Sequence, residues 1–132
     1  MERLLLLCER GGYAPLHQAV SAGAAAVAQG IRVDLVLFHG ALAGYLDGQI
    51  DVIGADHPHA AEARAAQEAG RTGPVSETLG AARSSGLRLF ACSASVVLQG
   101  REPAEIANDV DEVVGWPTIL NWMSSADRVL YL

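Results

Sequence analysis

The sequence lacks lysine and any run of basic residues. Its nine basic residues are all arginines spread along the chain, and the formal net charge is −6. A chain with this charge balance is not expected to bind nucleic acid or an anionic membrane surface. Long hydrophobic runs are also missing, since the apolar run at residues 4–8 is too short for a signal sequence or a membrane span. These absences favour a cytoplasmic protein.

Cysteine is scarce, and the motifs of common cofactor sites are absent. The two cysteines, Cys8 and Cys92, do not make a disulfide framework, so both thiols are expected to stay reduced. Gly11-Gly12 lacks the GxGxxG spacing of a dinucleotide site. The stretch at residues 56–59 (DHPH) offers three side chains that can bind a metal, but no further ligand is evident, which favours a solvated loop. We expect neither a metal nor an organic cofactor.

The alternation of short apolar segments with helical patterns predicts the fold class. The chain has 132 residues, of which 51% are hydrophobic, which is enough for one domain with a buried core. No hairpin signal joins the apolar segments, so we expect a single domain (residues 1–132) with a parallel sheet and helices on both faces. Strands are expected at residues 4–9, 31–38, 87–92, 110–114 and 128–132, and helices at 15–30, 41–46, 60–69, 75–85, 93–100, 103–108 and 117–125.

Cys92 lies where the third strand is expected to lead into a helix, within the stretch LRLFACSASVVLQG at residues 87–100. Parallel α/β sheets usually carry their functional groups at this edge, and the first amides of the helix favour thiolate over thiol. Cys92 is therefore the candidate nucleophile. The alternative is a small buried side chain that closes the strand, which is the commoner role of a free cysteine.

Three neighbouring residues are candidates to support Cys92. Ser93 and Ser95 can donate hydrogen bonds to a thiolate, although capping of the helix explains them equally well. His39 ends the second strand and should lie on the same edge, where it would favour the thiolate or accept the thiol proton. The alternative for His39 is a loop residue that faces solvent. Cys8 lies inside the first apolar strand, so we expect a buried core thiol there.

Two tryptophans, Trp116 and Trp122, flank the last expected helix in a chain with only 5% aromatic residues. They indicate either an interface or a pair in which one ring is buried and the other partly exposed. On the helix expected at residues 117–125, the expected inward residues are Ile119, Leu120 and Met123. The high apolar fraction of so small a domain favours an oligomer.

Residues 86–132 resemble the DsrE/DsrF-like family, which includes small sulfur-relay proteins. The resemblance rests on ACSAS (91–95) with the helix that ends at Gly100, on VDEVVGWPTIL (110–120) and on the closing ADRVLYL (126–132). The family's order of elements also fits the N-terminal third more loosely. This resemblance implies a Rossmann-like three-layer α/β/α sandwich with a mostly parallel five-stranded sheet, often assembled into trimers or hexamers.

The same resemblance implies that Cys92 carries a persulfide, received from a donor protein and passed to an acceptor. We therefore expect a small sulfur carrier, a sulfurtransferase-like protein that forms a homo-oligomer and needs no cofactor. Two alternatives stay open: a non-catalytic oligomeric binding module and a redox-sensing thiol protein. An accessible Cys92 would favour a carrier or a sensor, whereas a Cys92 sealed in the core would exclude both and leave the binding module.

Overall fold

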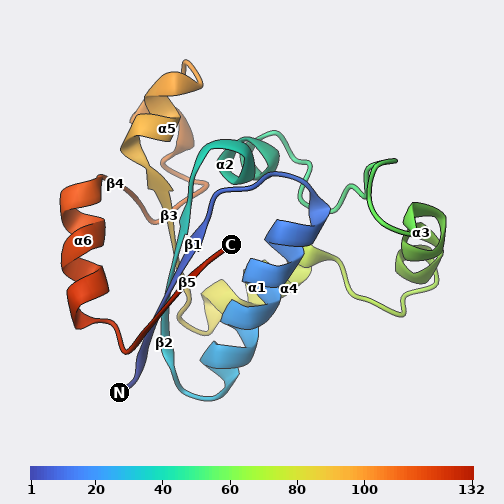
Figure 1. The fold of residues 1–132 in the computed structure, drawn as a ribbon, viewed down its shortest axis with the longest axis horizontal. Coiled ribbons are helices and arrows are strands. Elements are labelled where there is room, and N and C mark those ends of the chain that lie inside the picture. The colour runs from blue at the N-terminus through green and yellow to red at the C-terminus, as the bar shows by residue number, and fades with distance from the viewer.

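The computed structural model describes residues 1–132 as a five-stranded sheet in which all neighbouring strands are parallel. The strand order across the sheet is β4-β3-β2-β1-β5, so β1, β2 and β3 are interior and β4 and β5 are edges (Figure 1). The strands are β1 (Arg3–Cys8), β2 (Arg32–Leu37), β3 (Arg88–Cys92), β4 (Glu112–Val114) and β5 (Arg128–Tyr131).

Helices cover both faces of the sheet. α1 (Tyr13–Ala28) and α4 (Val75–Ser84) lie together on one face, and α6 (Trp116–Ser125) lies on the other (Figure 1). Three further short helices are α2 (His39–Leu46), α5 (Ser93–Leu98) and the 3₁₀ turn η1 (Pro103–Ile106), and each follows a strand or a helix at the carboxyl edge of the sheet. The predicted three-layer, Rossmann-like α/β fold is confirmed, and the sheet is parallel throughout.

The interior strands are apolar because both of their faces are covered. In β1, every residue from Leu4 to Cys8 is buried, and Leu6 pairs in register with Leu35 of β2. The exception in β2 is Asp34, which is fully buried and forms an ion pair with Arg3 at 2.9 Å. The sheet therefore divides the core into two clusters, 22 buried residues on the α1 face and eight on the α6 face.

α6 corrects one prediction from the sequence pattern. Ile119 is fully buried as expected, but Leu120 and Met123 are 55% and 37% exposed. The inward stripe runs instead through Ile119, Trp122 and Ala126, which follow at spacings of three and four residues. Two large apolar side chains of α6 are consequently left facing outward.

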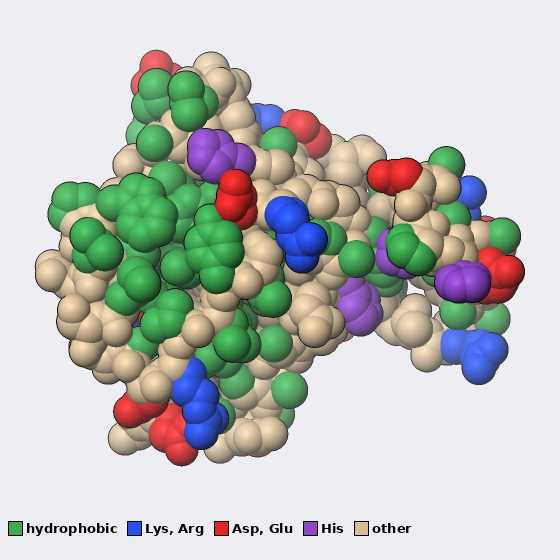
Figure 2. Space-filling model, in the orientation of Figure 1, with side chains coloured by type: hydrophobic (Ala, Val, Ile, Leu, Met, Phe, Trp, Pro, Cys, Tyr) green, Lys and Arg blue, Asp and Glu red, His purple; other side chains and the backbone are tan.

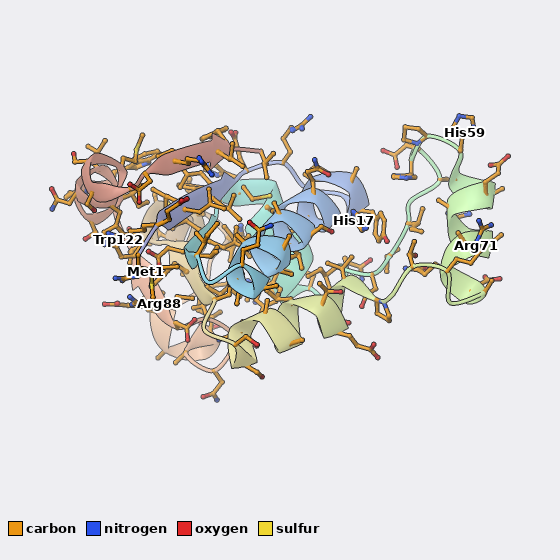
Figure 3. All side chains as sticks on the ribbon, turned by 90° about the horizontal axis from the view of Figure 1, so that it is seen from below. Met1, His17, His59, Arg71, Arg88 and Trp122 are labelled. Atoms are coloured by element: carbon orange, nitrogen blue, oxygen red, sulfur yellow. The ribbon has the colours of Figure 1, made fainter.

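α3 (Ala60–Glu68) stands away from the body of the molecule and has no buried residue. Figure 3 shows His59 and Arg71, which flank this helix, at the opposite end of the molecule from Trp122. Arg64 donates hydrogen bonds of 3.0 and 2.9 Å to the carbonyl oxygen of Ile53, which hold α3 to its own loop. No helix in the structure combines the length and apolar character needed to cross a membrane.

Candidate functional site

Cys92 is the last residue of β3, at the carboxyl edge of the sheet. It pairs with Val114 of β4, and the preceding residue Ala91 pairs with Leu37 of β2. α5 begins at the next residue, so Cys92 occupies the strand-to-helix junction that the sequence pattern predicts. The residue therefore lies between two neighbouring strands whose ends point to the same edge.

The thiol of Cys92 is not open to solvent. The residue is 2% exposed and belongs to the smaller core cluster, together with Phe38 and Val114. α6 closes that cluster with Ile119, and its Trp122 packs at the border. No hydrogen bond joins the Cys92 sulfur to another group. A reagent therefore cannot reach this sulfur unless the residues that cover it move.

Ser95 and His39 are brought together, although through the backbone of His39. The Oγ atom of Ser95, which is fully buried, accepts a hydrogen bond of 2.9 Å from the His39 N–H. Gln99 donates its side-chain N–H to the His39 carbonyl oxygen at 3.0 Å. Ser95 and Gln99 thus bond both backbone polar groups of His39, and these two hydrogen bonds connect the end of β2 to α5.

His39 itself adopts a left-handed backbone conformation, with φ of 36°, and its side chain is exposed. Such a conformation is uncommon outside glycine and is held here by the two hydrogen bonds from α5. The imidazole therefore lies at the sheet edge near the β3–α5 junction but makes no hydrogen bond to the buried thiol. His39 is therefore exposed, as the alternative expectation had it, although it is the first residue of α2 and not part of a loop.

Ser93 is half-buried at the first position of α5, and neither Ser93 nor Ser95 caps that helix. Instead, the Ser93 hydroxyl lies against the turn between β4 and α6: a Cβ atom at Gly115 would approach its Oγ atom to 3.3 Å. The hydroxyl of Ser93 is therefore close to the beginning of the helix that covers Cys92.

The turns after β1 and β2 are in direct backbone contact at the same edge. A Cβ atom at Gly40 would lie 2.8 Å from the Gly11 amide nitrogen, and one at Gly11 would lie 3.0 Å from the Gly40 carbonyl oxygen. Only glycine permits this approach, because these atoms belong to the backbone and have little room to shift. This close contact explains why position 11 is a glycine. The sequence pattern had indicated only a weak resemblance to a phosphate-binding turn there.

Cys8 is fully buried in the larger core cluster, as expected of a core thiol. Its sulfur donates a weak hydrogen bond to the Pro15 carbonyl oxygen at 3.7 Å. Burial raises the pKa of Cys8 to about 11, with Arg10 opposing part of this effect. Because Cys8 and Cys92 belong to clusters on opposite faces of the sheet, they cannot form a disulfide within this fold.

A cleft of about 350 Å³ lies elsewhere, at the turn after β1. Tyr13 and Gln49 line it together with His57, whose ring meets the Tyr13 ring edge-on at a centroid distance of 5.6 Å. None of the surface clefts is lined by Cys92 or His39. Sequence reasoning missed this cleft; its only signals were Gly11-Gly12 and the DHPH stretch.

The DHPH stretch is divided by the fold. His57 packs on Tyr13, whereas His59 begins α3 with a left-handed φ of 53° and is exposed. No three His, Cys, Asp or Glu side chains gather in positions that could hold a metal ion. The stretch serves as a connection between the body and α3.

The two tryptophans differ in exposure. Trp122 is half-buried and packs on Phe90 with a ring-centroid distance of 4.7 Å. Trp116 is 43% exposed and packs on Phe38 at 5.5 Å. Both rings pack on phenylalanines of the cluster that contains Cys92, so aromatic contacts help to hold α6 on the sheet beside the buried Ile119.

Fold and site together define a class of protein: a Rossmann-like α/β domain with a buried cysteine at the carboxyl edge of its parallel sheet. In comparisons with known proteins, no family model matches the chain, and no curated protein matches it.

Proposed function

We propose that this protein is a small cytoplasmic sulfur carrier of the DsrE/DsrF-like type, with Cys92 as the carrier thiol. The observation that carries the proposal is the position of Cys92 at the end of an interior parallel strand, where α/β proteins concentrate their chemistry. The Cys92 thiolate attacks the outer sulfur of a donor persulfide, the sulfur–sulfur bond breaks, and the electron pair leaves with the donor thiolate. Cys92 then holds a persulfide, with no net oxidation and no cofactor.

The same chemistry run in reverse passes the sulfur to an acceptor thiol. Donor and acceptor are proteins that carry reactive cysteines, and a reducing compartment keeps Cys92 available for them. Because Cys92 is 2% exposed, the proposal requires α6 to open transiently, so that a small donor as well as a partner protein can reach the thiol. In this proposal His39, which is exposed at the same edge, accepts the thiol proton once the site opens.

Intact-mass spectrometry after incubation with a small persulfide donor tests this proposal on the wild type, Cys92→Ser and Cys8→Ser. We expect the wild type and Cys8→Ser to gain the mass of one sulfur atom, and Cys92→Ser to gain none. Absence of the adduct from all three proteins, with slow alkylation of Cys92 in the folded chain, would overturn the carrier proposal.

A non-catalytic oligomeric binding module is the second candidate, and the burial of Cys92 specifically favours it. In a binding module Cys92 only fills the core, so Cys92→Ser would retain partner binding while adding no mass in the persulfide experiment. Preferential modification of Cys92 by peroxide over persulfide would instead identify a redox-sensing thiol.

A further inference from the structure

An apolar face built from α5, α6 and β5 is a surface feature that the proposed function leaves unexplained. Seven of the nine exposed large hydrophobic side chains belong to these three elements. Figure 2 shows hydrophobic side chains gathered on this side of the molecule. They are Val97 and Leu98 of α5, Trp116, Leu120 and Met123 of α6, and Leu130 and Tyr131 of β5, with exposed fractions from 37% to 74%.

β5 contributes unpaired backbone groups to this apolar face because it is an edge strand. Leu132, just after β5, is bonded to β1 and the residue that follows it through both of its backbone groups. Its N–H donates to the Leu7 carbonyl oxygen at 2.7 Å, and its carbonyl oxygen accepts from the Glu9 N–H at 2.9 Å. Along a strand, the backbone N–H and C=O groups of successive residues point alternately to one side and the other. The N–H and C=O groups of Val129 and Tyr131 therefore point away from β1. Such a free edge is a template for pairing with another strand.

The side chains of β5 are those of an interior strand. Leu130 is 45% exposed and lies on the same sheet face as Leu132, which packs against the larger core cluster. Tyr131 is 58% exposed and lies on the opposite face with Val129, which packs against the smaller cluster. A strand that is apolar on both faces normally has a neighbour on each side, and β5 has only β1.

We infer that a second copy of this chain covers the apolar face, with the two β5 strands paired antiparallel about a two-fold axis at Leu130. In this register, Val129 of each copy lies opposite Tyr131 of the other, so the outward backbone groups of both strands find partners. Leu130 then faces Leu130 of the second copy as a close, non-hydrogen-bonded pair. The two five-stranded sheets become one continuous sheet.

Charge and area favour a second copy as the occupant. Each copy carries a net charge of −6, so two copies can approach closely only through a surface that carries little charge. At the margin of the apolar face, Glu9 is engaged by the Tyr131 hydroxyl at 2.6 Å, and Arg128 pairs with Glu2 at 3.6 Å. Seven half-exposed side chains of this size offer an area on the order of the ~800 Å² that each partner buries in a stable interface.

This pairing does not depend on sulfur chemistry at Cys92, so either proposal can fail without the other. A two-fold contact can build a dimer or a hexamer with dihedral symmetry, and it excludes a trimer with only three-fold symmetry. Of the trimers and hexamers that the family resemblance implies, the inference is compatible with the hexamer and excludes the trimer.

Cross-linking through Leu130 tests the inference on the full chain. In the proposed pair the two Cα atoms lie about 4.5 Å apart, a spacing that a disulfide can bridge. We expect Leu130→Cys to form a covalent dimer under mild oxidation with oxidised glutathione, as seen on a non-reducing gel. The matched control is Val52→Cys, because Val52 is 50% exposed but lies outside the apolar face. That control and the wild type should remain uncross-linked.

Sedimentation equilibrium of the wild type and Leu130→Arg provides the second measurement. The wild type should sediment as a dimer or as a larger assembly with an even number of copies. The dissociation constant of Leu130→Arg should be at least tenfold higher than that of the wild type. Val52→Arg should match the wild type. A wild type that stays monomeric at its highest soluble concentration overturns the inference. An oligomer that Leu130→Arg leaves intact, with no Leu130→Cys cross-link, also overturns it, because another surface would then form the interface.

Discussion

Cys8 and Cys92 are both buried, but at the scale of single residues their surroundings differ. Cys8 lies deep in the larger cluster between β1 and α1, whereas Cys92 lies at the end of its strand under α6. For Cys8, burial holds the pKa at about 11, well above the ordinary value of 9.0. The folded chain therefore retains this proton more tightly than the unfolded chain does.

Replacement of Cys8 by alanine should change the pH dependence of folding. In the wild type, the stabilisation linked to this proton is complete below about pH 9 and is lost as the pH rises toward 11. The free energy of unfolding should therefore fall by about 2 kcal/mol more across that range in the wild type than in Cys8→Ala. Urea unfolding of both proteins at about pH 9 and about pH 11 measures this difference in free energy of unfolding. If the free energy falls equally in the two proteins, Cys8 does not titrate in this way.

Gly40→Ala should destabilise the contact between the turns after β1 and β2. Its Cβ atom would lie 2.8 Å from the backbone nitrogen of Gly11, so one turn must shift, at a cost of about 1–3 kcal/mol in free energy of unfolding. Gly80→Ala in α4 is the matched control, because no atom lies within 4 Å of its added Cβ and alanine favours helix. Equal stability of the two variants in urea unfolding would contradict the close approach.

At the scale of elements, the strands were the most predictable feature of the sequence. Each interior strand is a short apolar run because both of its faces are covered, and its expected and observed ends differ by at most one residue. α6 was harder, because its Leu120 and Met123 are as apolar as its inward residues. Hydrophobic character alone cannot separate a side chain that meets the sheet from one that faces outward.

The hydrogen bonds between α5 and His39 predict a specific effect of Ser95→Ala. The substitution removes the acceptor of the His39 N–H at a fully buried position, which should cost about 1–3 kcal/mol in free energy of unfolding. It should also accelerate hydrogen exchange of the His39 amide. Ser84→Ala is the control, because Ser84 is exposed near the end of α4. Unchanged exchange at His39 would show that Ser95 does not hold this turn.

The loop before α3 shows where sequence reasoning at this scale ended. Residues 49–58 carry no regular apolar period, so the pattern gave no indication that they form one wall of a cleft with Tyr13. The contact between His57 and Tyr13 joins residues that are far apart in the sequence. Contacts of this kind depend on the path of an irregular loop, which local propensities do not fix.

For the molecule as a whole, the predicted fold class was correct because at least one helix separates every two successive strands, which leaves few topologies open. The burial of Cys92 was left open by the sequence, because a strand end looks the same whether a helix covers it or not. That cover comes from α6, which begins 24 residues after Cys92. Access to Cys92 is therefore a property of the assembled domain.

The placement of the two thiols on opposite faces of the sheet limits how the molecule can recover from oxidation. A sulfenic acid formed on Cys92 has no second thiol within reach in the same chain, since the β-sheet separates it from Cys8. Reduction must therefore come from a thiol on another molecule. The turnover of a modified Cys92 would consequently depend on the concentration of that external thiol and on how often α6 opens.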